Sequence, residues 1–244
     1  MLFRSLKYDI LSVIKAIRND RLLQLMIPYQ ICFGLSAGFI GYYINKNVVA
    51  IYLGDGYIGL LTALSTFCAA LLSYPFALIS NYSNGRGKWY IMIFGSICFC
   101  LTGFIPLLYS NKILSKWENV ILYYLIHGAA RGCWENTNKA VIVDYFPNHE
   151  NRDTAFSAVY FSSGLSGALG YYFYKYMSRD CMVLINFIIP LIALISYHFS
   201  DKIYYDTKLD NDINRVNILR DNNNNCNDDN DEIEMKIREE KMTI

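Results

Sequence analysis

Long apolar stretches alternate with short polar segments along most of this 244-residue chain. A helix that crosses a bilayer needs roughly 20 predominantly apolar residues, and six stretches come close to that length. The pattern therefore predicts an all-α integral membrane protein whose six-helix transmembrane domain occupies residues 22–200. The predicted transmembrane helices are residues 22–44, 57–79, 89–109, 119–145, 154–176 and 181–199.

Polar segments flank this domain at both ends. In residues 1–21, apolar residues recur at helical spacing among basic ones. This pattern is typical of an amphipathic helix on the cytoplasmic membrane surface, or of a solvated helix that lies against the bundle. The segment lacks the uninterrupted apolar run of a secretory signal peptide. Residues 201–244 are acidic and rich in Asn, so we expect a disordered tail.

The distribution of charge predicts an orientation in the membrane. Residues 201–244 hold 7 Lys+Arg and 12 Asp+Glu, a net −5, whereas the rest of the chain holds 15 and 9, a net +6. If both termini are cytoplasmic, ten Lys and Arg lie near the predicted helix ends on the cytoplasmic side, with residues beyond 208 left out, and five lie on the other side. Because cytoplasmic loops carry an excess of Lys and Arg, we expect this orientation. Arg86 and Lys88 then lie in the cytoplasmic loop between the second and third helices.

The fourth predicted helix carries polar and charged side chains in its middle. Because α-helical residues turn about 100° each, most of these side chains share one face, and Lys139 lies further round. A charge near the bilayer centre costs at least about 2.5–3.5 kcal/mol, and it is tolerated where it pairs or faces a water-filled cavity. We therefore expect a polar face that lines a cavity, together with one residue of the first helix. The candidate cavity-lining residues are His127, Arg131, Trp134, Glu135, Asn138 and Gln30.

Other interpretations of this face remain open. Arg131 and Glu135 are four residues apart, so they can form an ion pair that only fixes helix packing. His127 with Glu135 could relay protons, since His titrates near physiological pH. A lone His on a membrane helix more often serves as a hydrogen-bonding group between helices. The segment could also be something other than a helix.

Small residues indicate where helices approach closely. Gly34 and Gly38 form a GxxxG pair in the first helix, and the fifth helix, residues 154–176, is rich in Gly and Ser. Both patterns favour tight packing between membrane helices.

No enzyme motif stands out in the sequence. GxSxG, HExxH, GxxxxGK[ST] and a GxGxxG that follows a strand are all absent, so we expect neither catalysis nor a cofactor. The seven Cys show no metal-ligand spacing, and we interpret them as small buried side chains. Basic residues at the helix ends are explained by lipid headgroups, so we expect a lipid bilayer and no nucleic acid as partner.

Three features together resemble one six-helix half of a major facilitator superfamily protein. They are six predicted helices with both termini in the cytoplasm, the loop NGRGK between the second and third helices, and polar first and fourth helices. The resemblance implies two inverted three-helix repeats whose first helices line a cavity. The basic amphipathic segment at residues 1–21 resembles the linker that joins the two halves of such a protein. This implies that the chain corresponds to the C-terminal half.

The segment 128–170 resembles the uncoordinated-93-like family of this superfamily, which is named for an ion channel regulatory protein. In that family the tenth helix reads Trp-Gln-x-x-Asn-x-Ala and ends in Phe-Pro. This sequence departs from the pattern at Glu135, where the family has Gln, and at Arg131. The matching residues are Trp134, Asn138, Ala140, Phe146, Pro147, Ala155, Phe156, Gly164 and Gly170.

The resemblance implies two classes of function and no catalytic residues. One is transmembrane transport through the polar cavity. The other is an accessory or trafficking subunit of a channel or receptor, and an inactive half-transporter fragment is a further alternative. Six helices leave half a cavity open to lipid, so we expect a homodimer or a second six-helix half to close it. The sequence does not specify the membrane.

Overall fold

The computed structural model describes residue 11 and residues 13–81 and 86–222. Within these residues the chain is almost entirely helical, with two π-helical segments and no strand, which confirms the all-α class. Most of the predicted amphipathic segment lies outside the described residues. The elements are α2 (Arg21–Phe39), η1 (Ile40–Ala50), α3 (Gly56–Ser80), α4 (Gly87–Leu108), α5 (Asn111–Leu114), α6 (Trp117–Gly132), η2 (Cys133–Asn138), α7 (Lys139–Tyr145), α8 (His149–Tyr174) and α9 (Arg179–Asn222).

Helical segments lie over all six predicted transmembrane ranges. By length and hydropathy, four helical stretches in the described part of the chain could cross a membrane: Arg21–Ala50, Gly56–Ser80, Gly87–Leu108 and Arg179–Arg215. The continuous stretch α6–η2–α7 and helix α8 are not among these four. Charged side chains lower the hydropathy of α6–η2–α7, and Gly, Ser and a polar first turn lower the hydropathy of α8. Six crossings therefore stay a prediction.

The first membrane helix extends beyond its predicted end. It continues without a break as the π-helix η1 to Ala50, so Asn45 and Lys46 are helical rather than part of a loop. The Tyr124 hydroxyl donates a hydrogen bond to Asn45 Oδ1, and the Lys46 ammonium lies 5.5 Å from the centroid of the Tyr42 ring. Both polar side chains thus have partners that compensate for their position on the helix.

The last helix also continues past its predicted end. Residues 201–222 are helical as part of α9, whereas their acidic, Asn-rich composition predicted disorder. This stretch contains neither Gly nor Pro, and extending an existing helix avoids the unfavourable nucleation step. Residues 223–244 of the predicted tail lie outside the described residues.

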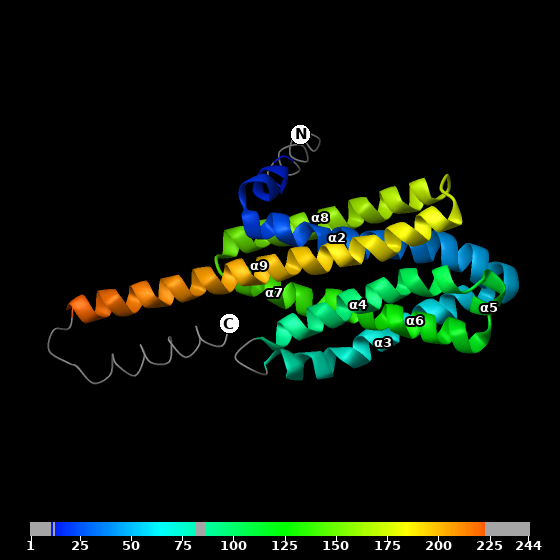
Figure 1. Ribbon diagram of the computed structural model, residues 1–244, viewed down its shortest axis with the longest axis horizontal. Coiled ribbons are helices and arrows are strands. Elements are labelled where there is room, and N and C mark those ends of the chain that lie inside the picture. Colours follow the sequence, from blue (N-terminus) through cyan, green and yellow to red (C-terminus); the bar gives the residue numbers. More distant parts are fainter. Residues whose placement is uncertain (1–10, 12, 82–85, 223–244) are drawn as a thin grey trace. The chain divides into compact units, whose positions relative to one another are not determined.

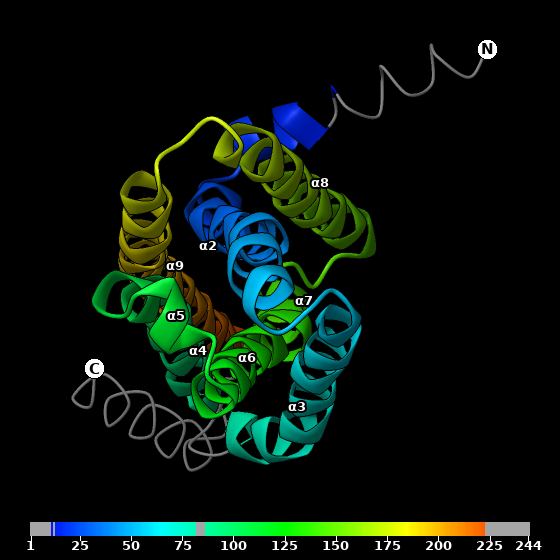
Figure 2. The ribbon, with the colours of Figure 1, turned by 90° about the vertical axis from the view of Figure 1, so that its right-hand side faces the viewer.

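The described residues up to His198 form one compact unit, in which two helix pairs are in close contact. Helix α2 packs along α8, and α3 packs along α6, which also contacts α4. Figure 1 shows these helices side by side, and Figure 2 shows α2 next to α8 and α3 beside α6. The polar segment α6–η2–α7 connects the two pairs, because α6 packs against α3 and α7 contacts α8.

The contact between α2 and α8 is made by small residues. A Cβ atom added at Gly34 would lie 2.1 Å from Ser166 Oγ and 2.3 Å from the carbonyl oxygen of Ser163. A Cβ atom at Gly38 would lie 3.1 Å from the carbonyl oxygen of Gly167. The GxxxG pair therefore allows α2 to approach the Gly- and Ser-rich helix that the sequence predicted for tight packing.

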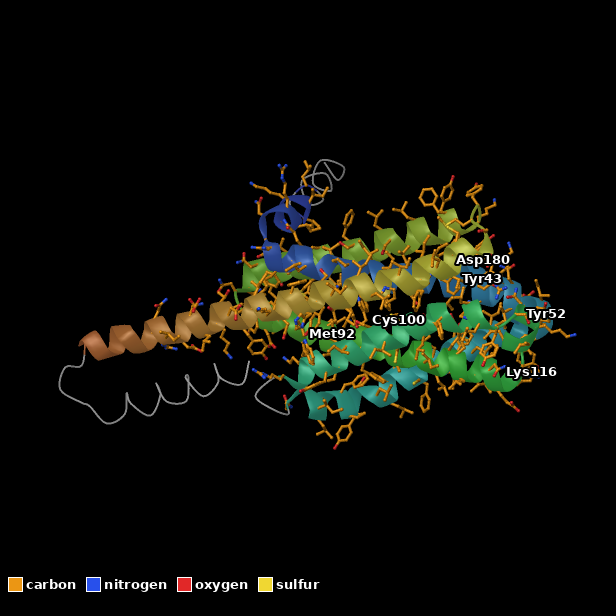
Figure 3. All side chains as sticks on the ribbon, in the orientation of Figure 1. Tyr43, Tyr52, Met92, Cys100, Lys116 and Asp180 are labelled. Atoms are coloured by element: carbon orange, nitrogen blue, oxygen red, sulfur yellow. The ribbon has the colours of Figure 1, made fainter. Side chains whose placement is uncertain are left out.

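An apolar cluster joins the helices at one end of this unit. It includes Tyr43 and Ile44 of η1, Tyr123 and Tyr124 of α6, and Val183 of α9, all almost fully buried. Figure 3 shows Tyr43 and Asp180 at this end, near Tyr52 and Lys116, while Met92 of α4 lies toward the opposite end. The turn at Gly54, whose φ is 107°, lies at the same end as the cluster.

Replacing Gly34 by Ala is expected to destabilise the bundle, because the new methyl group would overlap the α8 backbone. Overpacking of this kind costs about 1–3 kcal/mol. Gly164→Ala is the matched control, since a Cβ atom at Gly164 of α8 meets nothing within 4 Å. Thermal unfolding of the detergent-solubilised protein should show a lower Tm for Gly34→Ala and no loss for Gly164→Ala. Equal Tm values for the two variants would contradict the close contact.

Candidate functional site

The polar helix changes its geometry in the middle of the predicted polar face. Residues 133–138 form the π-helix η2, with α6 before it and α7 after it. A π-helical turn is wider than an α-helical turn, and such segments often occur at functional sites. The residues beyond Cys133 therefore do not follow regular α-helical spacing, and the predicted single face is divided into two groups.

The first group faces α3. The His127 Nδ1 atom lies 3.0 Å from Ser65 Oγ, and Arg131 Nη1 donates to Thr66 Oγ1 at 3.1 Å. Arg131 Nε and Glu135 Oε1 are 2.7 Å apart, and their side chains are 30% and 31% exposed. The ion pair expected from the spacing is thus formed, and it stays partly accessible between α3 and α6.

His127 takes part in a contact between helices. Its ring is buried beside α3, and among the described residues its Nε2 atom has no hydrogen-bond partner. The neighbouring Gly128 allows this approach, since a Cβ atom there would lie 2.5 Å from the Ser65 carbonyl oxygen. This geometry fits the interpretation of His127 as a hydrogen-bonding group between helices.

The second group faces α2 and is almost fully buried. Trp134 Nε1 donates to Gln30 Oε1 at 2.7 Å. Gln30 and Asn138 exchange two hydrogen bonds, because Asn138 Nδ2 donates to Gln30 Oε1 and Gln30 Nε2 donates to Asn138 Oδ1, each at 3.2 Å. Gln30 and Asn138 are 0% exposed and Trp134 is 5% exposed. The first and fourth predicted membrane helices are therefore joined by a buried amide pair.

Three further residues surround Trp134. The Phe33 ring stacks on it with centroids 3.8 Å apart and planes within 3°, and the Tyr160 ring meets it edge-on at 6.1 Å. The Lys139 ammonium lies 5.7 Å from the centroid of Trp134 and 5.5 Å from that of Tyr160. Sequence reasoning noted the charge of Lys139 but did not place it in the site. Nothing in the sequence singled out Phe33 or Tyr160, because their orientation depends on packing between helices.

The expected loop residues lie at the start of α4. Lys88 is the second residue of this helix rather than a loop residue, and its Nζ atom pairs with Asp144 Oδ2 of α7 at 2.5 Å. Arg86 directly precedes the helix. The Lys88–Asp144 pair holds the start of α4 against the end of the polar helix.

The described residues contain no group of three or more His, Cys, Asp or Glu side chains placed to hold a metal ion. The six cysteines in this part of the chain are free thiols, and Cys226 lies outside it. Cys32, Cys98 and Cys133 are buried as expected, whereas Cys181 is exposed because it lies at the start of α9. The site therefore offers hydrogen bonds, one ion pair, one ammonium group and aromatic faces for interaction with a ligand.

The hydrogen bonds between Gln30 and Asn138 should give a measurable coupling energy. A double-mutant cycle with Gln30→Ala and Asn138→Ala should yield about 0.6–1.7 kcal/mol, the range found for polar contacts between membrane helices. Unfolding by SDS in mixed micelles would measure it. The control cycle pairs Gln30→Ala with His127→Ala, whose contact is on α3, and should show coupling close to zero. Equal coupling in both cycles would rule out a specific amide pair.

Comparison with known proteins agrees with this architecture. Residues 26–208 match the Major Facilitator Superfamily. The chain is also 25% identical over 195 residues to Protein unc-93 homolog A from Xenopus laevis, an alignment that covers 80% of this chain and 41% of that protein. This similarity confirms the resemblance to uncoordinated-93-like proteins, and the chain spans less than half the length of this relative. The family match covers most of the chain, which is therefore a multi-pass membrane protein of the major facilitator superfamily.

Proposed function

We propose that this protein is a carrier in which the segment α6–η2–α7 lines the path of a small solute. The observation that carries the proposal is the partly exposed Arg131–Glu135 ion pair on a helix that is predicted to cross the membrane. A charged pair is unfavourable in contact with lipid tails and is tolerated beside water or protein. A water-filled path along the α3–α6 side would provide that environment.

The buried group supports the same proposal from the other side of the helix. Gln30 belongs to α2, and Asn138 ends the π-helical segment η2. Their hydrogen bonds join the two helices that, in an arrangement of inverted repeats, begin each three-helix repeat and line the cavity. A π-helical segment next to this joint provides backbone that can rearrange when a solute binds.

The proposed topology has six crossings between residues 22 and 200, arranged as two inverted repeats, with both termini in the cytoplasm. In this arrangement Arg131 and Glu135 need cover on their exposed side. A second six-helix bundle, from another copy of the chain or from a separate half, would supply it. The share of unc-93 homolog A that the chain spans, 41%, is consistent with one half of such a protein.

An accessory subunit is the second candidate function. The same partly exposed ion pair would also be covered if a channel or receptor packed against α3 and α6. In that case the charges would fix the position of the partner rather than contact a solute. Crosslinking in native membranes separates the two candidates, because a carrier closes with a six-helix bundle and an accessory subunit is captured with a different membrane protein.

Neutralising the ion pair should reduce transport while the protein remains folded. We expect Arg131→Gln with Glu135→Gln to lower solute uptake by at least about tenfold, equivalent to about 1.4 kcal/mol, because the path loses its charged contacts. Proteoliposomes exposed to a metabolite mixture, with uptake followed by mass spectrometry, provide the measurement. The control is His149→Gln with Asp153→Asn, a highly exposed i,i+4 pair at the start of α8. Unchanged uptake in the Arg131/Glu135 double variant would refute the carrier proposal.

The orientation predicts which cysteines are accessible from each side of the membrane. Cys181 is exposed at the start of α9 and should face the side opposite to the cytoplasm, whereas Cys226 in the tail should be cytoplasmic. In sealed microsomes, an impermeant maleimide should label Cys226 at once and Cys181 only after detergent is added. Cys181→Ser and Cys226→Ser variants assign the two signals. If Cys181 were labelled at once and Cys226 only after detergent is added, the topology would be the opposite of the one proposed.

A further inference from the structure

Lys139 is a cation within the polar helix, and no acidic side chain among the described residues neutralises it. In the part of the chain that the structure describes, it forms no ion pair, and its contacts are with the rings of Trp134 and Tyr160. The other charged groups nearby behave differently, since Arg131 pairs with Glu135 and Lys88 pairs with Asp144. Lys139 therefore contributes the uncompensated positive charge of the site.

The direction of the Lys139 side chain is informative. A lysine near the end of a membrane helix usually extends its ammonium toward the nearest interface. Helix α7 ends at Tyr145, six residues beyond Lys139, which is about 9 Å at 1.5 Å per residue. The ammonium instead lies near Trp134, which precedes Lys139 in the same helix. The ammonium is thus directed toward the middle of the polar helix rather than toward its end at Tyr145.

The aromatic neighbours hold this charge in a defined place. Trp134 is fixed by the stacked Phe33 ring and by its hydrogen bond to Gln30. An aromatic face attracts an ammonium group through its quadrupole, but the three N–H donors of the ammonium still need oxygen acceptors. Lys139 is partly exposed, so its N–H donors are open to water or to the oxygen atoms of a ligand.

We propose that Lys139, flanked by Trp134 and Tyr160, binds the anionic group of the solute, a carboxylate or a phosphate. This inference rests on the proposed carrier function and specifies the class of substrate. Oxygen anions supply strong acceptors for an ammonium group. The Tyr160 ring is 49% exposed and provides an apolar surface beside the charge, so the site fits an anion with a flat or apolar body.

The test uses the full chain in phosphatidylcholine nanodiscs, with Trp89→Phe and Trp117→Phe so that Trp134 is the remaining tryptophan. Benzoate and phenyl phosphate are titrated, with benzamide as the neutral probe of similar shape. Both anions should change the Trp134 fluorescence in a saturable way, and benzamide should not. Lys139→Gln should weaken anion binding at least tenfold. Lys139→Arg should retain it, and Lys88→Gln, which affects a lysine already paired, should leave it unchanged.

Several results would overturn the proposal. They are an equal response to benzamide, no saturable response to either anion, or equal anion binding in Lys139→Gln. If the Lys139→Gln variant does not fold, the preference of the parent protein for anions over benzamide, together with the Lys139→Arg variant, still decides whether the site binds anions. Nanodiscs with added phosphatidylglycerol test the lipid alternative, because a response to this lipid with none to soluble anions would assign the site to a headgroup and refute a solute.

The same measurements separate this inference from the proposed function. Saturable anion binding with no uptake in proteoliposomes would leave the anion site in place and remove the carrier function. If the Lys139→Gln variant takes up a solute as well as the parent protein does, the carrier proposal stands and the anion-site proposal is refuted.

Discussion

Polar side chains on membrane-spanning helices are costly unless they are paired, and this constraint organises the interior of the protein. Two groups satisfy it in different ways: the buried amides of Gln30 and Asn138 satisfy each other, while Arg131 and Glu135 neutralise each other near an accessible surface. The amide pair joins two residues that are 108 positions apart in the chain. The ion pair keeps charge available where a solute path is proposed.

The positions of these groups depend on close contacts between backbones. Gly34 allows α2 to lie against α8, and this contact fixes the rotation of α2 that directs Gln30 and Phe33 toward the polar helix. On the other side, Gly128 allows α6 to lie against α3, where Ser65 meets His127. The polar helix thus approaches α3 closely at Gly128, while Gly34 holds α2 against α8, and the polar residues divide between α3 and α2.

Lys139 differs from both groups because its partners are aromatic rings. A cation between Trp134 and Tyr160 is stabilised without being neutralised, so it can still bind an anion. The ion pair on the α3 side carries no net charge, and the selectivity of the site for charge would therefore come from Lys139. This division of roles gives the polar helix a neutral side and a cationic side.

The sequence by itself determined the all-helical membrane class, the approximate positions of the helices, the ion pair at four-residue spacing and the close-packing glycines, because each depends on local composition or spacing. It also singled out Gln30, Trp134 and Asn138, which the structure brings together by hydrogen bonds, since polar groups on membrane helices need partners. It could not show that the polar face divides at η2 or that Tyr160 and Phe33 flank Trp134. Those features depend on helix rotation and π-helical geometry, which only contacts between residues distant in the sequence decide.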